Sequence, residues 1–284
     1  MSYDVVVVGG GPAGLSAALQ VRAREKSALV VGDDRDSSLW KAEKIDNYLG
    51  LPDKTGAELL TLFAQHAERA GVARNKAKVL SAMPMGEGFF LSVGSDVEEA
   101  GAIVLALGVS RGKKVPGEER LLGAGVSYCA TCDGALYRNR PVAVVGASAD
   151  APEEANFLAE LGCQVTYVAP KRPDGLREDL PFVKGVRLEV KGEKSVEALS
   201  VDGADLPCDC VFFLRPSMAP ADLIPGLALN GSYIAVDREQ KTNLPGVFAA
   251  GDCTGLPLQI SKAVGEGMMA GHKAAEYLDA KKRK

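Results

Sequence analysis

The chain has 284 residues, of which 46% are hydrophobic and 25% are charged, with a formal net charge of −4. These proportions indicate a globular protein large enough for two domains, and the slight negative charge argues against a nucleic-acid partner. No apolar run approaches the roughly 18 residues that span a bilayer, and the N-terminus lacks the features of a signal peptide. We therefore expect a cytoplasmic protein without a membrane partner.

The first predicted elements form a nucleotide-binding turn. A strand at 4–8 leads into Gly9, Gly11 and Gly14, which have the spacing G-x-G-x-x-G, and a helical pattern follows. Glycine at these positions lets the backbone turn sharply and lets a pyrophosphate approach the helix N-terminus. The motif occurs in many nucleotide-binding domains, so it does not identify the cofactor.

A second strand, at 28–31, completes a βαβ unit and ends at Gly32. Asp33 and Asp34 follow the first glycine by about 20 residues, where a carboxylate that binds a ribose is expected. Two solvated loop acids would give the same pattern. The sequence leaves both interpretations open.

The rest of the chain repeats this layout. A helix at 57–70 and strands within 76–107 follow, and a hinge is expected at 109–119, where glycine, proline and charge gather. A second strand–turn–helix–strand pattern then begins near residue 142 and ends near 169. A second hinge is expected at 236–247, before a final strand and a long helix. This weak repeat predicts an α/β fold with two Rossmann-like domains.

The stretch Cys129-Ala130-Thr131-Cys132-Asp133-Gly134 contains a C-x-x-C motif. Such a pair is either a redox dithiol or half of a zinc site, and a zinc site needs a second pair with suitable spacing. Cys208 and Cys210 are only one residue apart within an apolar strand pattern. We therefore interpret Cys129 and Cys132 as a redox dithiol and expect no metal.

Together, the motifs GGGPAG, CATCDG and FAAGDCTGLPLQ resemble the low-molecular-weight thioredoxin reductases, over nearly the whole chain. The resemblance implies a homodimer that binds FAD and reduces thioredoxin or a thioredoxin-like protein. It also implies that residues 1–110 and 243–284 build one FAD-binding domain, into which a central domain, residues 111–242, is inserted.

Site residues also follow from the resemblance. It implies that Cys132 takes electrons from the flavin, that Cys129 attacks the partner's disulfide, and that Asp133 moves the proton, which is the chemistry that thiol–disulfide exchange needs. The FAD contacts that it implies, beside the turn glycines Gly9 and Gly14, are Gly11, Pro12, Ala13, Gly32, Asp33, Ser38, Leu39, Asn47, Asp252, Gln259, Ile260 and Ser261.

The second glycine turn departs from the family's pattern. Its middle glycine is replaced by Ser148, Asp150 places a carboxylate at the helix N-terminus, and Pro152 removes an amide donor from the first helical turn. All three changes oppose the binding of NADPH. Lys171 and Arg172 argue the other way, because they follow the next strand, where the family binds the 2′-phosphate.

This departure matches a subset of the family that lost NADPH binding and is reduced by ferredoxin, which the stretch SSLWKAEKIDNYLG also resembles. We therefore expect ferredoxin as the donor, with Arg111, Lys113 and Lys114 as candidate contacts for an acidic partner. The alternatives are an NADPH-dependent enzyme, a diflavin-linked oxidoreductase with a second flavin in the vacated site, and a flavoprotein binding module with regulatory cysteines.

Overall fold

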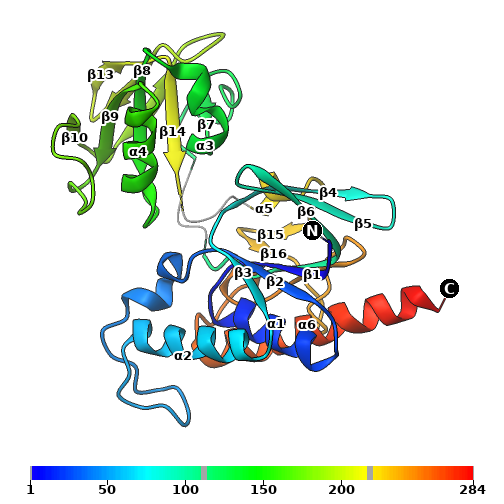
Figure 1. Ribbon diagram of the computed structural model, residues 1–284. Helices are drawn as coiled ribbons and strands as arrows, with labels where there is room; N and C mark the ends of the chain where they lie inside the picture. The colour runs from blue at the N-terminus through cyan, green and yellow to red at the C-terminus, as the bar shows by residue number, and fades with distance from the viewer. Residues whose placement is uncertain (1, 110–113, 216–219, 284) are drawn as a thin grey trace. The chain divides into compact units, whose positions relative to one another are not determined.

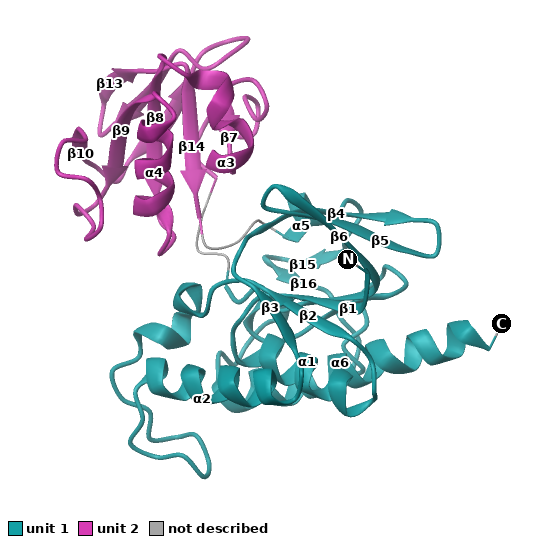
Figure 2. Ribbon diagram, in the orientation of Figure 1, with its two compact units in different colours: residues 1–110, 217–284 teal, residues 111–216 magenta. Residues whose placement is uncertain are grey.

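The computed structural model describes residues 2–109, 114–215 and 220–283. The chain forms two compact units: unit 1 comprises 1–110 and 217–284, and unit 2 comprises 111–216 (Figure 2). Each unit contains a parallel sheet with helices, so the fold is α/β with two Rossmann-like domains, the second inserted into the first.

The sheet of unit 1 has the strand order β3-β2-β1-β6-β5-β4, and β17 also pairs with β6 (Figure 1). The strands β3, β2, β1, β6 and β17 are parallel, whereas β5 and β4 continue the sheet as an antiparallel ribbon. The strand bounds are β1 Ser2–Val8, β2 Ala28–Val31, β3 Ala73–Asn75, β4 Val79–Met85, β5 Gly88–Val93, β6 Asp96–Leu105 and β17 Val247–Ala249.

Both faces of this sheet are covered, which explains why its central strands are apolar without alternation. Val5 and Val7 face a core with the helices α1, α2 and α6, whereas Val6 and Val8 face a core with β4, β5 and α5. No helix in the described ranges is both long and apolar enough to cross a membrane. The helix bounds are α1 Pro12–Ala23, α2 Gly56–Arg69, α5 Pro220–Leu223 and α6 Ile260–Lys282.

The two helices nearest the glycine turn, α1 and α6, pack against each other through glycine. A Cβ on Gly267 would lie 2.1 Å from the carbonyl oxygen of Ala13, and a Cβ on Gly271 would lie 2.2 Å from that of Ala17. Only glycine permits this approach of two backbones. The C-terminal helix therefore supports the first turn of α1 directly.

Unit 2 is built around the parallel order β10-β9-β8-β14-β7, with a separate sheet β11-β12-β13. The helices α3 and α4 pack on one face of the parallel sheet, and β11 to β13 pack on the other. The bounds are β7 Val126–Ser127, α3 Ala130–Asp133, β8 Pro141–Gly146, α4 Ala151–Glu160, β9 Gln164–Ala169, β10 Phe182–Lys184, β11 Leu188–Lys191, β12 Ala198–Val201, β13 Ala204–Pro207 and β14 Cys210–Leu214.

The second boundary between the units corrects the sequence analysis, which placed it at residues 242 and 243. Residues 217–242 belong to unit 1. Leu223, Ile224 and Ile234 are at most 1% exposed, because they complete the core behind β4 and β5. This segment was missed because its elements are too short to leave a periodic pattern in the sequence. They are α5 and the ribbon formed by β15 Leu229–Asn230 and β16 Tyr233–Ile234.

Candidate active site

The first glycine turn has a backbone that only glycine can adopt. Gly9 has a φ of 121°, and a Cβ on it would lie 2.2 Å from the carbonyl oxygen of Ala106. A Cβ on Gly14 would lie 1.9 Å from the carbonyl oxygen of Gly9. The predicted turn is therefore present between β1 and α1, with its glycines required by close packing.

This turn also leaves hydrogen-bond donors free. Gly11 is the N-cap of α1, and no side chain caps the helix. In the ranges that the structure describes, the amides of Gly10 and Gly11 have no acceptor. Pro12 and Ala13 follow as the first helical residues. Free amides at a helix N-terminus attract a phosphate, so the turn fits the pyrophosphate of a dinucleotide.

The two acids after β2 have different partners. Arg35 binds Asp33 through its backbone amide at 2.9 Å and through its guanidinium at 2.8 Å, whereas Arg74 binds Asp34. Burial would raise the pKa of Asp33, but the hydrogen bonds and charge of Arg35 outweigh it and lower the pKa. Burial raises the pKa of Asp34 despite Arg74. Asp33 and Gly32 lie at the carboxyl end of β2, as a ribose-binding position requires.

Sequence reasoning missed both arginines. The only available signal was a basic residue two positions after Asp33, which is common in loops. Arg74 lies on β3, 40 residues from Asp34, and only the pairing of β2 with β3 brings them together.

Two distant segments expected at the flavin do meet. The amide nitrogen of Asn47 donates to Oε1 of Gln259 at 3.0 Å, across 212 residues of sequence. Gln259 is the N-cap of α6, whose first residues are Ile260 and Ser261, and it makes no side-chain cap. Ser38 and Leu39 begin the 3-10 helix η2, Ser38–Lys41, which Ser37 caps.

The loop that carries Asp252 is held by an ion pair from α6. Glu266 accepts the amide of Gly251 and the hydroxyl of Thr254, both at 2.9 Å. Lys262 lies 3.0 Å from Glu266 and donates to the carbonyl oxygen of Gly251 at 2.9 Å. These contacts fix the backbone on either side of Asp252. Neither α6 residue had been singled out from the sequence.

In unit 2, Cys129 and Cys132 form a disulfide with their Cα atoms 5.3 Å apart. Cys129 is the N-cap of α3, and its sulfur accepts the amide of Cys132 at 3.2 Å. The hydroxyl of Thr131 lies 3.3 Å from the same sulfur. The structure therefore brings the two predicted cysteines together at the start of a one-turn helix, in the form that a redox disulfide requires.

Asp133 is anchored from the neighbouring strand. Its carboxylate accepts the hydroxyl of Ser127 at 2.7 Å, and its amide donates to the carbonyl oxygen of Cys129 at 3.2 Å. Ser127 is only 5% exposed. Sequence reasoning did not select Ser127, which was one more small polar residue ahead of the motif.

The other four cysteines are free and buried. Burial raises the pKa of Cys208 and of Cys253 to about 11, and it also raises the pKa of Cys163 and Cys210. These thiols are protonated at neutral pH and are poor nucleophiles. In the part of the chain that the structure describes, no three His, Cys, Asp or Glu side chains are grouped to bind a metal.

The second turn, between β8 and α4, differs from the first in its hydrogen bonds. The amides of Ala147 and Ser148 both donate to the carbonyl oxygen of Leu214, at 2.8 and 3.0 Å. Gly146 is outside the left-handed region that Gly9 occupies. A Cβ on Gly146 would lie 1.8 Å from the buried hydroxyl of Tyr167. The second turn therefore satisfies the amides of Ala147 and Ser148 within the protein.

Asp150, Pro152 and Arg172 also bear on whether this turn could hold a phosphate. Asp150 is the N-cap of α4 without a side-chain cap, and Pro152 lies in the first turn. The guanidinium of Arg172 donates to the carbonyl oxygen of Arg177 at 2.6 Å and lies 5.7 Å from the ring centre of Phe182. Arg172 is thus engaged by its own loop.

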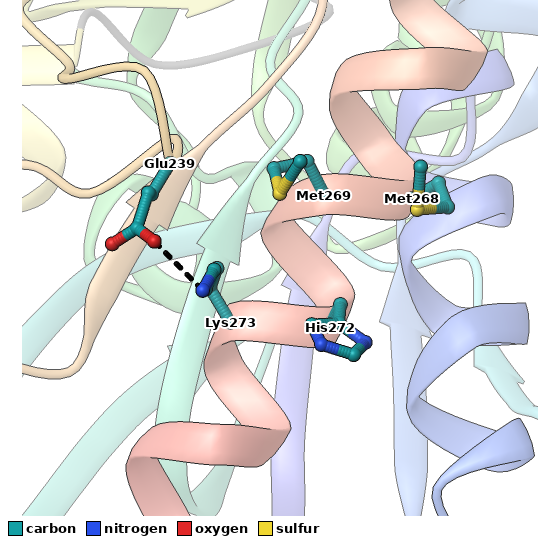
Figure 3. A pocket seen from close by; sticks show the side chains of 5 residues that line it. All are labelled: Glu239, Met268, Met269, His272 and Lys273. Carbon is teal, nitrogen blue, oxygen red and sulfur yellow. Dashed lines mark ion pairs between the residues drawn. The ribbon is translucent and has the colours of Figure 1, made fainter.

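A separate hollow of about 320 Å³ lies on α6, lined by two methionines and three polar residues (Figure 3). An ion pair of 2.7 Å joins Lys273 to Glu239 beside it. None of the predicted site residues lines this hollow. The lining residues are Glu239, Met268, Met269, His272 and Lys273.

Comparison with known proteins agrees with this geometry. The sequence model of the pyridine nucleotide-disulphide oxidoreductase family matches residues 3–267 of this chain. A thioredoxin reductase of Listeria monocytogenes is 33% identical, over 98% of this chain and 94% of the relative. A structure of a ferredoxin-flavin thioredoxin reductase from Clostridium acetobutylicum is 40% identical over 100% of both chains, with a TM-score of 0.96. A thioredoxin reductase structure from Gloeobacter violaceus is 32% identical over 99% of this chain and 95% of that one, with a TM-score of 0.88.

Proposed function

The chain belongs to the thioredoxin reductases of the pyridine nucleotide-disulphide oxidoreductase family, and from this premise we propose that it takes electrons from ferredoxin. The electrons pass through FAD to the Cys129–Cys132 disulfide and then to thioredoxin or a thioredoxin-like protein. The observation that carries the choice of donor is the hydrogen bonding of the second turn, where Leu214 occupies the amides of Ala147 and Ser148.

Membership of this family implies a flavin, and the residues of unit 1 fit FAD. The turn offers free amides to a pyrophosphate, and Asp33 lies where a ribose is expected. When bound, FAD supplies a centre that accepts electrons singly and passes them on in pairs. The proposed contacts are Gly9, Gly11, Pro12, Ala13, Gly14, Gly32, Asp33, Ser38, Leu39, Asn47, Asp252, Gln259, Ile260 and Ser261.

After the disulfide has been reduced, the residues of unit 2 carry out two exchange steps. In the first, the Cys129 thiolate attacks the partner's disulfide, whose S–S bond breaks, and protonated Asp133 gives its proton to the leaving thiolate. In the second, Asp133 takes the proton of Cys132, and the Cys132 thiolate attacks the sulfur of Cys129. The second partner thiolate leaves and receives that proton. The partner gains two electrons and two protons.

The second turn argues against a nicotinamide donor. A pyrophosphate there would meet amides that already have an acceptor and the carboxylate of Asp150, and a lost charge-assisted hydrogen bond costs about 1.5–3 kcal/mol. The same features oppose a second flavin at this turn. Ferredoxin needs no docked nucleotide, because it delivers single electrons to an exposed flavin edge.

The candidate contacts for ferredoxin are the basic residues near the first hinge. Of the candidate contacts, Arg111 and Lys113 lie outside the described residues, and Lys114 lies 3.6 Å from Glu119.

A homodimer is proposed because of the family resemblance.

The test is anaerobic reduction of the purified flavoprotein. We expect NADPH to leave the flavin oxidised, whereas reduced ferredoxin bleaches it and then reduces thioredoxin, more slowly as salt increases. Rapid bleaching by micromolar NADPH would show an ordinary NADPH-dependent enzyme. Bleaching without reduction of thioredoxin would favour a flavoprotein with regulatory cysteines.

A further inference from the structure

We propose that Ser127 is a positioning residue that fixes the acid Asp133 and the attacking Cys129 through a single oxygen atom. This inference rests on the proposed function, because it concerns the exchange steps of the same dithiol. It adds a residue outside the C-x-x-C motif to the machinery of unit 2.

The hydrogen bonds around Ser127 Oγ define its role. The amide of Cys129 donates to this oxygen at 3.1 Å, so one lone pair is occupied. The hydroxyl has one proton and two nearby acceptors: the carboxylate of Asp133 at 2.7 Å and the carbonyl oxygen of Cys129 at 3.4 Å. A short bond to a carboxylate is the stronger of the two. Ser127 therefore donates to Asp133 while it accepts from Cys129.

The oxygen is held on a rigid support. Ser127 lies on the edge strand β7 and pairs with Phe212 of the inner strand β14. The side chain of Phe212 is fully buried. Ser127 itself is 5% exposed, so it has little freedom to turn away. The one-turn helix α3 that carries Cys132 and Asp133 is thus tied to the parallel sheet by a side chain as well as by its own backbone.

This arrangement serves the two exchange steps. The carboxyl group of Asp133 must release a proton to a leaving thiolate and then take the proton of Cys132, without moving away between the steps. The hydroxyl of Ser127 holds one carboxyl oxygen, Oδ2, and leaves the other, Oδ1, for the sulfur atoms. Ser127 neither gains nor loses a proton overall. Misplacement by as little as about 1 Å slows such transfers strongly.

The experiment isolates these steps from the electron donor. The protein is reduced anaerobically with two equivalents of dithionite, which supply the four electrons that reduce both the flavin and the disulfide, and is mixed rapidly with oxidised thioredoxin. The reaction is quenched in acid, and the new thiols of thioredoxin are then alkylated and counted. We expect Ser127→Ala to slow thioredoxin reduction by at least about tenfold, as for loss of a hydrogen bond to a charged group. Ser127→Thr keeps the hydroxyl and restores most of the rate.

Two controls separate positioning from general damage. Ser200 is also buried, at 7% exposed, and its hydroxyl bonds to Asp205 in the sheet β11-β12-β13, so Ser200→Ala should keep the wild-type rate. In an Asp133→Ala background, Ser127→Ala should slow the reaction far less than in the wild type, because only the bond to the Cys129 amide remains to be lost.

Three outcomes would overturn the inference. A wild-type rate for Ser127→Ala would show that the hydroxyl is dispensable. A full additional loss in the Asp133→Ala background would show that Ser127 acts independently of the acid. Failure of the reduced wild-type protein to reduce thioredoxin at all would overturn the proposed function as well, and this result is distinct from the other two.

Discussion

Arg215 and Glu118 form a buried ion pair in unit 2, next to the points where the chain crosses to unit 1. Both terminal nitrogens of Arg215 bind the carboxylate of Glu118, which is 0% exposed. The same carboxylate accepts the hydroxyl of Tyr128 at 3.0 Å and the amide of Val115 at 2.8 Å. One acid therefore joins both crossing segments to the residue that precedes Cys129.

Removing one partner of this pair should destabilise unit 2. Arg215→Met leaves a buried carboxylate without its cation, which costs about 3–5 kcal/mol in comparable cases. Arg187→Met is the matched control, because Arg187 is 85% exposed in its pair with Asp202 and its loss should change stability little. Denaturant unfolding measures both. Equal, small effects would show that the Glu118 pair contributes no more than a surface pair.

The stability conferred by this pair should depend on pH. Burial would raise the pKa of Glu118, but the hydrogen bonds from Arg215, Val115 and Tyr128, with the Arg215 charge, outweigh it and hold the pKa below its ordinary 4.5. A lowered pKa means that the stabilisation is complete above pH 4.5 and is lost as the pH falls through the folded-state pKa. The stability difference between wild type and Glu118→Gln should therefore shrink in acid. A constant difference would contradict this.

The first glycine turn should not tolerate a methyl group. Gly14→Ala places a Cβ 1.9 Å from the carbonyl oxygen of Gly9, so the turn must open and FAD should be lost. Gly265→Ala, on α6, meets nothing within 4 Å and should keep FAD and gain up to about 1 kcal/mol from helix propensity. Released flavin and thermal unfolding of the apoprotein report the two effects. Full FAD content in Gly14→Ala would be inconsistent with a pyrophosphate at this turn.

Restoring the missing glycine at position 148 should not restore NADPH binding at the second turn. Ser148→Gly removes a side chain, but the amides of residues 147 and 148 still donate to Leu214, and Asp150 keeps its charge. We expect no change in thermal unfolding when NADPH is added to this variant. Saturable stabilisation by NADPH would show that Ser148 alone excluded the nucleotide.

The two cysteines should differ in their effects. Cys132→Ser should stop electron transfer from the flavin, whereas Cys129→Ser should leave Cys132 as a free thiolate and produce a long-wavelength absorbance band. Visible spectra of the two purified variants make the comparison. Mild and equal changes in activity would indicate a structural disulfide.

The sequence predicted the features that depend on local steric requirements. Almost no residue other than glycine fits the backbone and packing at positions 9 and 14. The strands beside them are apolar because helices or strands cover both faces of the sheet. The adjacent motif of Cys129 and Cys132 likewise needed no knowledge of distant contacts. Elements of this kind are readable because their reasons lie within a few residues.

The features that the sequence did not predict depend on partners far along the chain. The carbonyl oxygen of Leu214, 66 residues beyond Ser148, accepts the amides of the second turn. Arg74 reaches Asp34 only because β2 pairs with β3. The boundary near residue 216 was missed because α5 and β15 are too short to show periodicity. A hydrogen bond or a short packed segment leaves no repeating pattern to detect.

The packing of α6 on α1 has a consequence for the order in which the protein folds during synthesis. Unit 2 is continuous in sequence and is complete once residue 216 has left the ribosome. The glycine turn of unit 1 is made first, but Gly267 and Gly271 support its helix only when α6 emerges. The apolar face of α1 therefore stays uncovered until α6, nearly the last segment of the chain, has been synthesised. We expect chaperones to bind nascent chains that are halted before α6.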